Sequence, residues 1–458
     1  MTNSASIRSA LVFATVMAAS VAADAGDIPA ASLKISGDWR LSVAVMPNSG
    51  RQQAAAVGNH QALTATLDVA PPAILSVQAE RYTRVPVYNA ADPCWRRGVT
   101  LRGVRANECP SPGLLDPSSL QVRAGPEADA ARFELGKDYA ADPEWGTFGR
   151  LPNGRIRKDQ TVYLDYRHGM LRIDTVVLTP DGQIVLRRGV PHVAAPLPPE
   201  LRRGERRLVN VWLPAWTKRL TAENLFPILE TAYPEPPKQS PSPAERLLPK
   251  TMAKLRHGQR LRVLAWGDSV TDGSYLPDPE RWQSQFAARL RARFPQAKIE
   301  MRTEAWGGRN TGSYLAEPAG SSHNYREKVL AARPDLIISE FVNDAGLNPH
   351  QVEQVYGKLL ADFTGIGAEW VILTPHDVRP DWMGLSSQRN IDHDPRPYVA
   401  GLREFGAKHR VALAEASLRY GRLWRQGIPY VTLMLNTINH PDARGMKIFA
   451  DSLMALFP

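Results

Sequence analysis

Residues 260–458 alternate between short apolar runs and segments with helical periodicity, and this alternation restricts the fold more than any other feature of the chain. Five apolar runs read as strands, and the segments between them carry apolar residues at helical spacing. Strands and helices that alternate in this way form a parallel sheet covered by helices on both faces. The apolar run at 335–342 is typical of a strand buried on both faces. We therefore predict a three-layer α/β/α domain around a parallel sheet.

The first half of the chain has a different pattern. Residues 26–233 lack helical periodicity over most of their length and contain apolar, β-branched runs separated by turn signals such as Asp181–Gly182. This pattern predicts a β-rich, sandwich-like N-terminal domain. The segment 234–250 contains six prolines and is predicted to be a linker. The second domain then covers residues 251–458, and a chain of 458 residues is long enough for both.

The first 25 residues read as a secretory signal peptide. Arg8 precedes an apolar run, residues 10–19, and small residues follow at Ala23 and Ala25. The run is shorter than the roughly 20 apolar residues that a membrane span needs, and no later segment qualifies. We expect an exported protein, either periplasmic or secreted.

The net charge restricts which binding partners we expect, and the cysteine content predicts one disulfide. The net charge is +10, but the arginines are scattered and lack the interleaved aromatic residues of a nucleic-acid platform. We therefore expect no nucleic-acid partner; a basic surface favours an anionic polysaccharide or envelope. The only cysteines, Cys94 and Cys109, are expected to form one disulfide in an exported protein.

Small polar residues follow the predicted strands at the edge where the carboxyl ends meet. Ser269 follows the first strand in a Gly-Asp-Ser turn, a Gly-Gly-Arg turn that includes Gly308 follows the second, and Asn343 follows the third. His440 precedes the last helix. Ligands of parallel sheets bind beyond these strand ends. A serine hydroxyl needs a base to become a nucleophile, and histidine suits that role.

These four blocks, in this order, resemble the SGNH, or GDSL, hydrolase family over residues 260–458, in particular its carbohydrate acetylesterases. The resemblance implies that Ser269 is the nucleophile and His440 its general base. It also implies an oxyanion hole made by the backbone N–H of Ser269, by Gly308 and by Asn343, with Gly307 as the alternative to Gly308. Such a centre needs no cofactor and no metal, and the sequence has no metal-ligand cluster.

One position departs from the family pattern. The family has Asp three residues before the histidine, and here that position is Thr437. Asn436 or Thr437, a backbone carbonyl, or another carboxylate such as Asp442 could orient the imidazole instead. We expect a Ser–His pair oriented by a carbonyl, because a neutral acceptor still selects the right tautomer.

Three further residues are candidates for substrate binding. Trp382 lies in a long loop, residues 376–397, where it could stack on a sugar, and His376 begins that loop. Asp344 follows Asn343. The leading interpretation is an exported serine esterase that removes small acyl groups, most simply acetyl, from poly- or oligosaccharides. The alternatives are a lipase or arylesterase of the same family, and a non-catalytic glycan-binding or envelope protein on the same fold.

Overall fold

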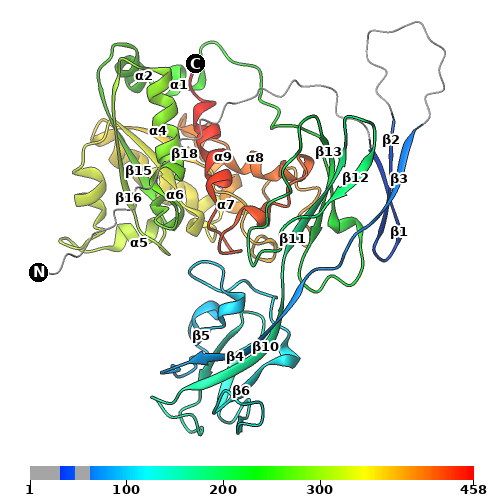
Figure 1. Ribbon diagram of the computed structural model, residues 1–458. Coiled ribbons are helices and arrows are strands. Elements are labelled where there is room, and N and C mark those ends of the chain that lie inside the picture. The colour runs from blue at the N-terminus through cyan, green and yellow to red at the C-terminus, as the bar shows by residue number, and fades with distance from the viewer. Residues whose placement is uncertain (1–30, 47–61) are drawn as a thin grey trace, which may run out of the picture.

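The computed structural model describes residues 31–46 and 62–458. The predicted signal peptide, residues 1–25, lies outside the described residues. Figure 1 shows antiparallel strands beside and below a domain in which helices surround a parallel sheet. Within the described residues, no helix is both long and apolar enough to cross a membrane.

The C-terminal domain has the predicted α/β architecture. Its five strands are all parallel, in the order β16-β15-β17-β18-β19. The strands are β15 (Arg260–Gly267), β16 (Lys298–Ala305), β17 (Leu336–Glu340), β18 (Glu369–Leu373) and β19 (Ala412–Ala414). The helices are α1 (Pro243–Leu247), α2 (Pro249–Arg256), α3 (Ser269–Asp272), α4 (Trp282–Arg293), α5 (Thr311–Ala316), α6 (Pro349–Gly365), α7 (Pro397–His409), α8 (Ala416–Gly421) and α9 (Ala443–Met454).

Helices cover both faces of this sheet, which gives three layers. Side chains alternate across β15: Val263 and Ala265 pack in the core that includes α4 and α9, while Leu264 and Trp266 pack in the core that includes α6 and α7. Because both faces are buried, the strand is apolar along most of its length. The prediction of a parallel sheet between helical layers is confirmed.

The N-terminal region is built from antiparallel sheets, as predicted. The sheets have the orders β1-β2-β3, β4-β10-β6-β7, β12-β11-β13-β14 and β5-β9-β8. The strands are β1 (Ala31–Gly37), β2 (Arg40–Val45), β3 (Leu63–Asp68), β4 (Ile74–Tyr82), β5 (Val99–Thr100), β6 (Gln121–Arg123), β7 (Arg132–Phe133), β8 (Tyr139–Asp142), β9 (Thr147–Arg150), β10 (Val162–Gly169), β11 (Arg172–Leu178), β12 (Ile184–Arg187), β13 (Arg206–Leu213) and β14 (Leu225–Pro227).

Single turns of 3-10 helix and one π-helical turn connect these elements. They are η1 (Cys94–Arg96), η2 (Arg102–Val104), η3 (Pro117–Ser119), η4 (Ala222–Asn224), η5 (Asp278–Glu280), the π-helical η6 (Arg326–Leu330), η7 (Val342–Asp344), η8 (Pro380–Met383), η9 (Leu423–Arg425) and η10 (Tyr430–Leu433). Sequence periodicity predicts a helix at 325–334, and the structure forms only η6 there.

The proline-rich segment 234–250 ends in helical structure. Pro243 and Pro249 each occupy the first turn of a helix, α1 and α2, where the backbone N–H has no intrahelical partner. Ala244 and Leu248 are fully buried in the core of the C-terminal domain. The density of prolines therefore excludes helix interiors from this segment but allows helix starts.

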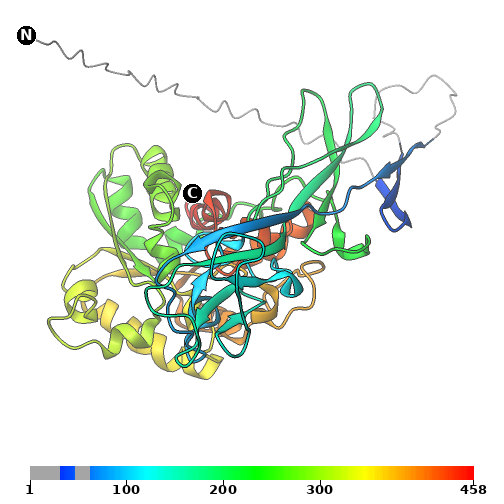
Figure 2. The ribbon, with the colours of Figure 1, turned by 60° about the horizontal axis from the view of Figure 1, so that its bottom comes forward.

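The two parts of the chain pack against each other. Ile228 pairs with Gln426 in an isolated β-bridge, and the side-chain amide of Asn210 donates to the Gly427 carbonyl at 2.8 Å. Trp424 of the C-terminal domain lies within a hydrophobic core formed mostly by N-terminal strands. Figure 2 shows the N-terminal strands passing close to the helices of the C-terminal domain. Residues far apart in sequence can therefore meet at one site.

A close backbone contact at Gly267 supports the turn that carries Ser269. A Cβ on Gly267 would lie 2.2 Å from the Glu340 carbonyl oxygen and 2.2 Å from Oγ1 of Thr271. We expect Gly267→Ala to lower the free energy of unfolding by about 3 kcal/mol, because β15 and β17 would have to separate. Gly357→Ala on α6, where a Cβ meets nothing within 4 Å, should raise it by about 0.5–1 kcal/mol. Denaturant unfolding measures both, and an unchanged Gly267→Ala protein would contradict the expectation.

Candidate active site

Ser269 lies at the crevice between the carboxyl ends of β15 and β17. β15 and β17 are neighbours, but β16 follows β15 in sequence and lies on its other side, so the chain leaves their carboxyl ends in opposite directions and a crevice forms there. The Asp268 carboxylate accepts the N–H of Val270 at 3.1 Å and caps α3. Ser269 begins this helix and is part-exposed, with its hydroxyl at the rim of the crevice.

His440 reaches the serine from the loop before α9. Its Nε2 lies 3.0 Å from Oγ of Ser269, which is hydrogen-bonding distance. The imidazole stacks on Tyr275, with ring centroids 4.4 Å apart and an interplanar angle of 2°. The ring is therefore held in the plane that presents one nitrogen to the hydroxyl. The structure brings together the two residues predicted to be nucleophile and base.

The other imidazole nitrogen faces a residue that sequence reasoning missed. Oε1 of Glu108, in the N-terminal region, lies 2.7 Å from Nδ1 of His440. The approach is close but not aligned as a straight hydrogen bond. Burial by itself would raise the pKa of Glu108, but the interaction with His440 and a hydrogen bond from Asn436 outweigh it and hold that pKa below its usual value.

This contact differs from our expectation of a carbonyl partner. The Thr437 hydroxyl donates to the carbonyl of Asn436 at 2.6 Å, and Thr437 has a left-handed φ of +60°. The Asp442 carboxylate accepts the N–H groups of Arg444 and Gly445 and caps α9. Neither side chain is available to Nδ1, and a carboxylate rather than a carbonyl occupies that position.

The predicted oxyanion-hole residues line the same cleft. Gly307, Gly308 and Asn343 border it together with Ser269 and His440. The Asn343 side-chain amide donates to the Arg309 carbonyl at 3.2 Å, and the Asn343 N–H donates to Asp268 at 2.9 Å. A Cβ on Gly307 would lie 3.7 Å from Cβ of Ser269, whereas one on Gly308 would meet nothing within 4 Å. Both glycines remain candidates for the backbone donor.

Two buried carboxyl groups lie behind the crevice. Burial raises the pKa of Asp268, which is fully buried beside the nucleophile. Burial also raises the pKa of Asp344 to about 6. Asp344 accepts hydrogen bonds from the Thr311 N–H at 3.1 Å and the Tyr356 hydroxyl at 3.0 Å. These contacts hold the strand-end loops in place.

Two of the three predicted substrate-binding residues are therefore in the wrong place for that role. Asp344 is 2% exposed and His376 is fully buried, with its ring near Tyr420 and Phe449. Burial lowers the pKa of His376 well below its usual value. Neither side chain lines the cleft, because both are buried within the domain. Trp382 does line the cleft and is 46% exposed.

Aromatic and basic side chains from both parts of the chain form one wall of the cleft. The rings of Trp95 and Trp382 lie 5.9 Å apart, and those of Trp95 and Trp145 lie 5.6 Å apart. The Arg379 guanidinium lies 5.8 Å above the Trp382 ring. We call Trp95 and Trp382, which both line the cleft, the tryptophan wall. Trp145 and Arg379 pack against these two rings but do not line the cleft. Arg96 and Arg309 also line the cleft.

The predicted disulfide is absent, which corrects the expectation from the sequence. Cys94 and Cys109 are both free thiols. Cys109 is buried and its Sγ donates to the carbonyl of Asn436, in the C-terminal domain, at 3.6 Å. Burial raises the pKa of the Cys109 thiol to about 12.

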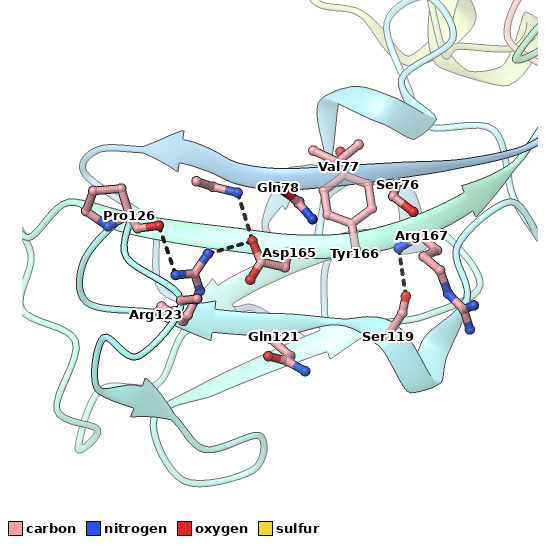
Figure 3. Close-up of a pocket in the computed structure, with 12 residues that line it drawn as sticks. Ser76, Val77, Gln78, Ser119, Gln121, Arg123, Pro126, Asp165, Tyr166 and Arg167 are labelled. Atoms are coloured by element: carbon pink, nitrogen blue, oxygen red, sulfur yellow. Dashed lines mark hydrogen bonds and ion pairs between the residues drawn. The ribbon is translucent and has the colours of Figure 1, made fainter.

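A second groove lies on the outer face of the sheet β4-β10-β6-β7 (Figure 3). Its central pair is Arg123 and Asp165, 2.7 Å apart, and the Ala79 N–H also donates to Asp165 at 2.8 Å. No histidine lines this groove, and its charged groups are all in ion pairs: Arg123 with Asp165, and Arg167 with Asp116 beside the groove. Within the described part of the chain, no three His, Cys, Asp or Glu side chains are grouped so that they could hold a metal ion.

Comparisons with solved structures find proteins that are similar to part of this chain. LAE5, an alpha/beta hydrolase enzyme from the metagenome of Lake Arreo, Spain, is 17% identical over 42% of this chain and 93% of its own, with a TM-score of 0.34. CEX, a two-domain esterase active on acetylated mannans, is 18% identical over 45% of this chain and 51% of its own, with a TM-score of 0.37. A mutant of Axe2, an acetyl-xylooligosaccharide esterase from Geobacillus Stearmophilus, is 15% identical over 44% of this chain and 94% of its own, with a TM-score of 0.35.

No curated protein matches the chain. Residues 265–448 match the sequence model of the GDSL-like lipase/acylhydrolase family, and this range contains the serine, glycine, asparagine and histidine blocks. Residues 265–448 therefore form a domain that matches the GDSL-like lipase/acylhydrolase family.

Proposed function

We propose that the protein is an exported serine esterase that removes small acyl groups, with acetyl as the first candidate, from poly- or oligosaccharides. The observation that carries the proposal is the 3.0 Å contact between Oγ of Ser269 and Nε2 of His440 at the mouth of a cleft. A hydroxyl paired with an imidazole in a cleft is the arrangement that acyl transfer requires.

The proposed reaction has two halves. Nε2 of His440 takes the proton of Ser269 as Oγ attacks the ester carbonyl, and the resulting oxyanion is stabilised by N–H donors at Ser269, Gly308 or Gly307, and Asn343. The intermediate collapses to an acyl-enzyme, and His440 returns the proton to the sugar alcohol that leaves. Water, activated by the same imidazole, then attacks the acyl group and releases the free acid and the serine hydroxyl.

The tryptophan wall supports a glycan as the substrate. The C–H face of a pyranose ring packs on an aromatic face, and Trp382 presents such a face to solvent at the cleft. The cleft opens on both domains and is not a closed apolar tunnel for a long acyl chain, since Arg96, Arg309 and Asn439 line it. These features favour a carbohydrate over a lipid.

Acetate release from acetylated xylan, xyloglucan and pectin tests the proposal directly. We expect the wild-type mature protein to release acetate from at least one of these and Ser269→Ala to release none above background. Equal release by both proteins would overturn the proposal. Hydrolysis of long-chain esters only would favour the lipase alternative.

Positive charge at the cleft leads to a prediction about the glycan. Arg96 and Arg309 line the cleft, and neither forms an ion pair with a described residue; Arg309 lies over the ring of Trp306 at 5.0 Å. We expect kcat/KM for an acetylated acidic glycan such as pectin to fall several-fold between about 0.02 and 0.5 M NaCl, because salt screens exposed charges. With neutral acetylated xylan, kcat/KM should change little. Equal salt dependence for both substrates would contradict a charge preference.

A further inference from the structure

We propose that Glu108 is a positioning residue of the active site, so that the β-rich N-terminal region supplies the third member of the Ser269–His440 centre. The inference rests on the proposed function and deepens it. It makes the N-terminal region part of the active site rather than an appended module.

The atoms of the three residues lie in the order that proton transfer needs. Ser269 contacts Nε2 of His440 at 3.0 Å, and Glu108 contacts Nδ1 at 2.7 Å. A carboxylate at Nδ1 favours the tautomer that carries its proton there, which leaves Nε2 free to accept the serine proton. The same negative charge stabilises the imidazolium that forms during attack. Glu108 would act only through His440 and would not itself take up the proton.

One buried amide ties Glu108 to the turn that carries His440. Nδ2 of Asn436 donates to Oε1 of Glu108 at 2.8 Å. Its Oδ1 accepts the backbone N–H groups of Ile438, Asn439 and His440 at 2.9–3.0 Å. Asn436 is only 2% exposed, so its amide is shielded from water. The carboxylate and the imidazole are therefore fixed to the same side chain.

Apolar packing holds the two regions together at this point. Cys109, next to Glu108 in sequence, packs in one cluster with Trp145 and Ile438, and its thiol donates to the Asn436 carbonyl. The Ile438 carbonyl in turn accepts the N–H of Arg379 at 2.9 Å. Cys109 is one position from Glu108, and Ile438 is two positions from His440. Their contact therefore fixes the segment that carries Glu108 to the loop that carries His440.

The other charged groups around His440 do not replace Glu108. Asp268 lies behind Ser269 and is held by the N–H groups of Val270 and Asn343, and Asp442 caps α9. His376 is buried, Tyr275 stacks on the ring, and Arg96 and Arg309 are cations of the cleft. Among the described residues, Glu108 is the acidic group in contact with Nδ1.

The variant Glu108→Gln tests the inference, because it keeps the shape and removes the charge. We expect kcat for acetyl release to fall about 30- to 100-fold, with KM changed less than about threefold. The loss is smaller than for a fully buried acid because the Glu108 side chain is 42% exposed and water can partly replace it. The matched control is Glu144→Gln, an exposed glutamate of the same region that does not line the cleft.

The pH profile separates positioning from a general structural effect. Without the carboxylate the imidazolium is less favoured, so the acid limb of the kcat/KM profile should move to lower pH in Glu108→Gln. Glu108→Asp keeps the charge and should keep the acid limb of the wild type while kcat falls. If Glu108→Gln does not fold, as judged by its unfolding transition, Glu108→Asp is tested instead, with kcat and the acid limb of the kcat/KM profile as the two measurements.

The failure of this inference can be told apart from the failure of the proposed function. If Ser269→Ala abolishes acetate release while Glu108→Gln keeps wild-type kcat and an unmoved acid limb, only the role of Glu108 is overturned. If Ser269→Ala is fully active, the proposed function itself is overturned. A lower kcat with an unmoved acid limb in Glu108→Gln would also overturn the positioning role.

Discussion

Replacing Ser269 with alanine is expected to lower kcat for ester hydrolysis by at least about 10⁴-fold, with little change in the unfolding transition. Oγ of Ser269 is the atom that would form the acyl-enzyme, and no other described hydroxyl contacts Nε2 of His440. Loss of a nucleophile removes the covalent route, whereas oxyanion stabilisation and binding leave a residual rate. The side chain is part-exposed, so its removal creates no large cavity.

A fluorophosphonate probe gives a readout that is independent of the substrate. The probe reacts with an activated serine, so we expect one label on the wild-type protein and none on Ser269→Ala. Ser274→Ala is the matched control, because Ser274 lies on the same loop but bonds to Asp272 at 2.5 Å and not to a histidine. Labelling of Ser269→Ala at the wild-type rate would show that the reactive serine lies elsewhere. No labelling of the wild type would favour a non-catalytic protein on this fold.

The sequence predicts the C-terminal domain well because its signals are local. The strand β15 alternates between two helical layers, so its residues are apolar whichever layer they face. Small polar residues follow β15 and β17 at the same edge of the sheet, which brings Ser269 and Asn343 to one crevice. Periodicity and strand ends are properties of short stretches of sequence, and they are visible without the structure.

The contribution of Glu108 is not visible in this way, because it depends on how two regions dock. Glu108 and His440 are more than 300 positions apart, and no spacing rule links them. The one available signal is that Glu108 is the single acidic residue in the segment from Cys94 to Cys109, which holds several arginines. At the same interface the Cys109 thiol donates to the Asn436 carbonyl, and Cys94 and Cys109 are both free thiols.

The interface between the two regions also bears on the one departure from the family pattern, the threonine at position 437. The backbone of Thr437 has a φ of +60°, and its hydroxyl donates to the Asn436 carbonyl. With a carboxylate supplied from another region, the position three residues before the histidine no longer needs an acid. If Glu108 orients His440 as proposed, the absence of an acid at position 437 does not by itself favour the non-catalytic alternative.

Asn343→Ala is expected to lower kcat about 10²–10³-fold while KM changes little, which corresponds to about 2.7–4 kcal/mol of transition-state stabilisation. The Asn343 side-chain amide lies at the cleft and donates to the Arg309 carbonyl, so it is already oriented before substrate binds. A donor held in place in this way interacts with charge that develops only during attack, and therefore acts on kcat rather than on binding.

Asn343→Asp distinguishes an oxyanion donor from a structural hydrogen bond. It has nearly the shape of asparagine but replaces the amide donor with a negative charge close to the developing oxyanion. If Asn343 stabilises the oxyanion, Asn343→Asp must lose more activity than Asn343→Ala at neutral pH, and part of that loss should be recovered as the carboxylate is protonated at lower pH. Steady-state kinetics of both variants between about pH 5 and pH 8 decide the point, since an equal loss in both at every pH would assign Asn343 to loop structure alone.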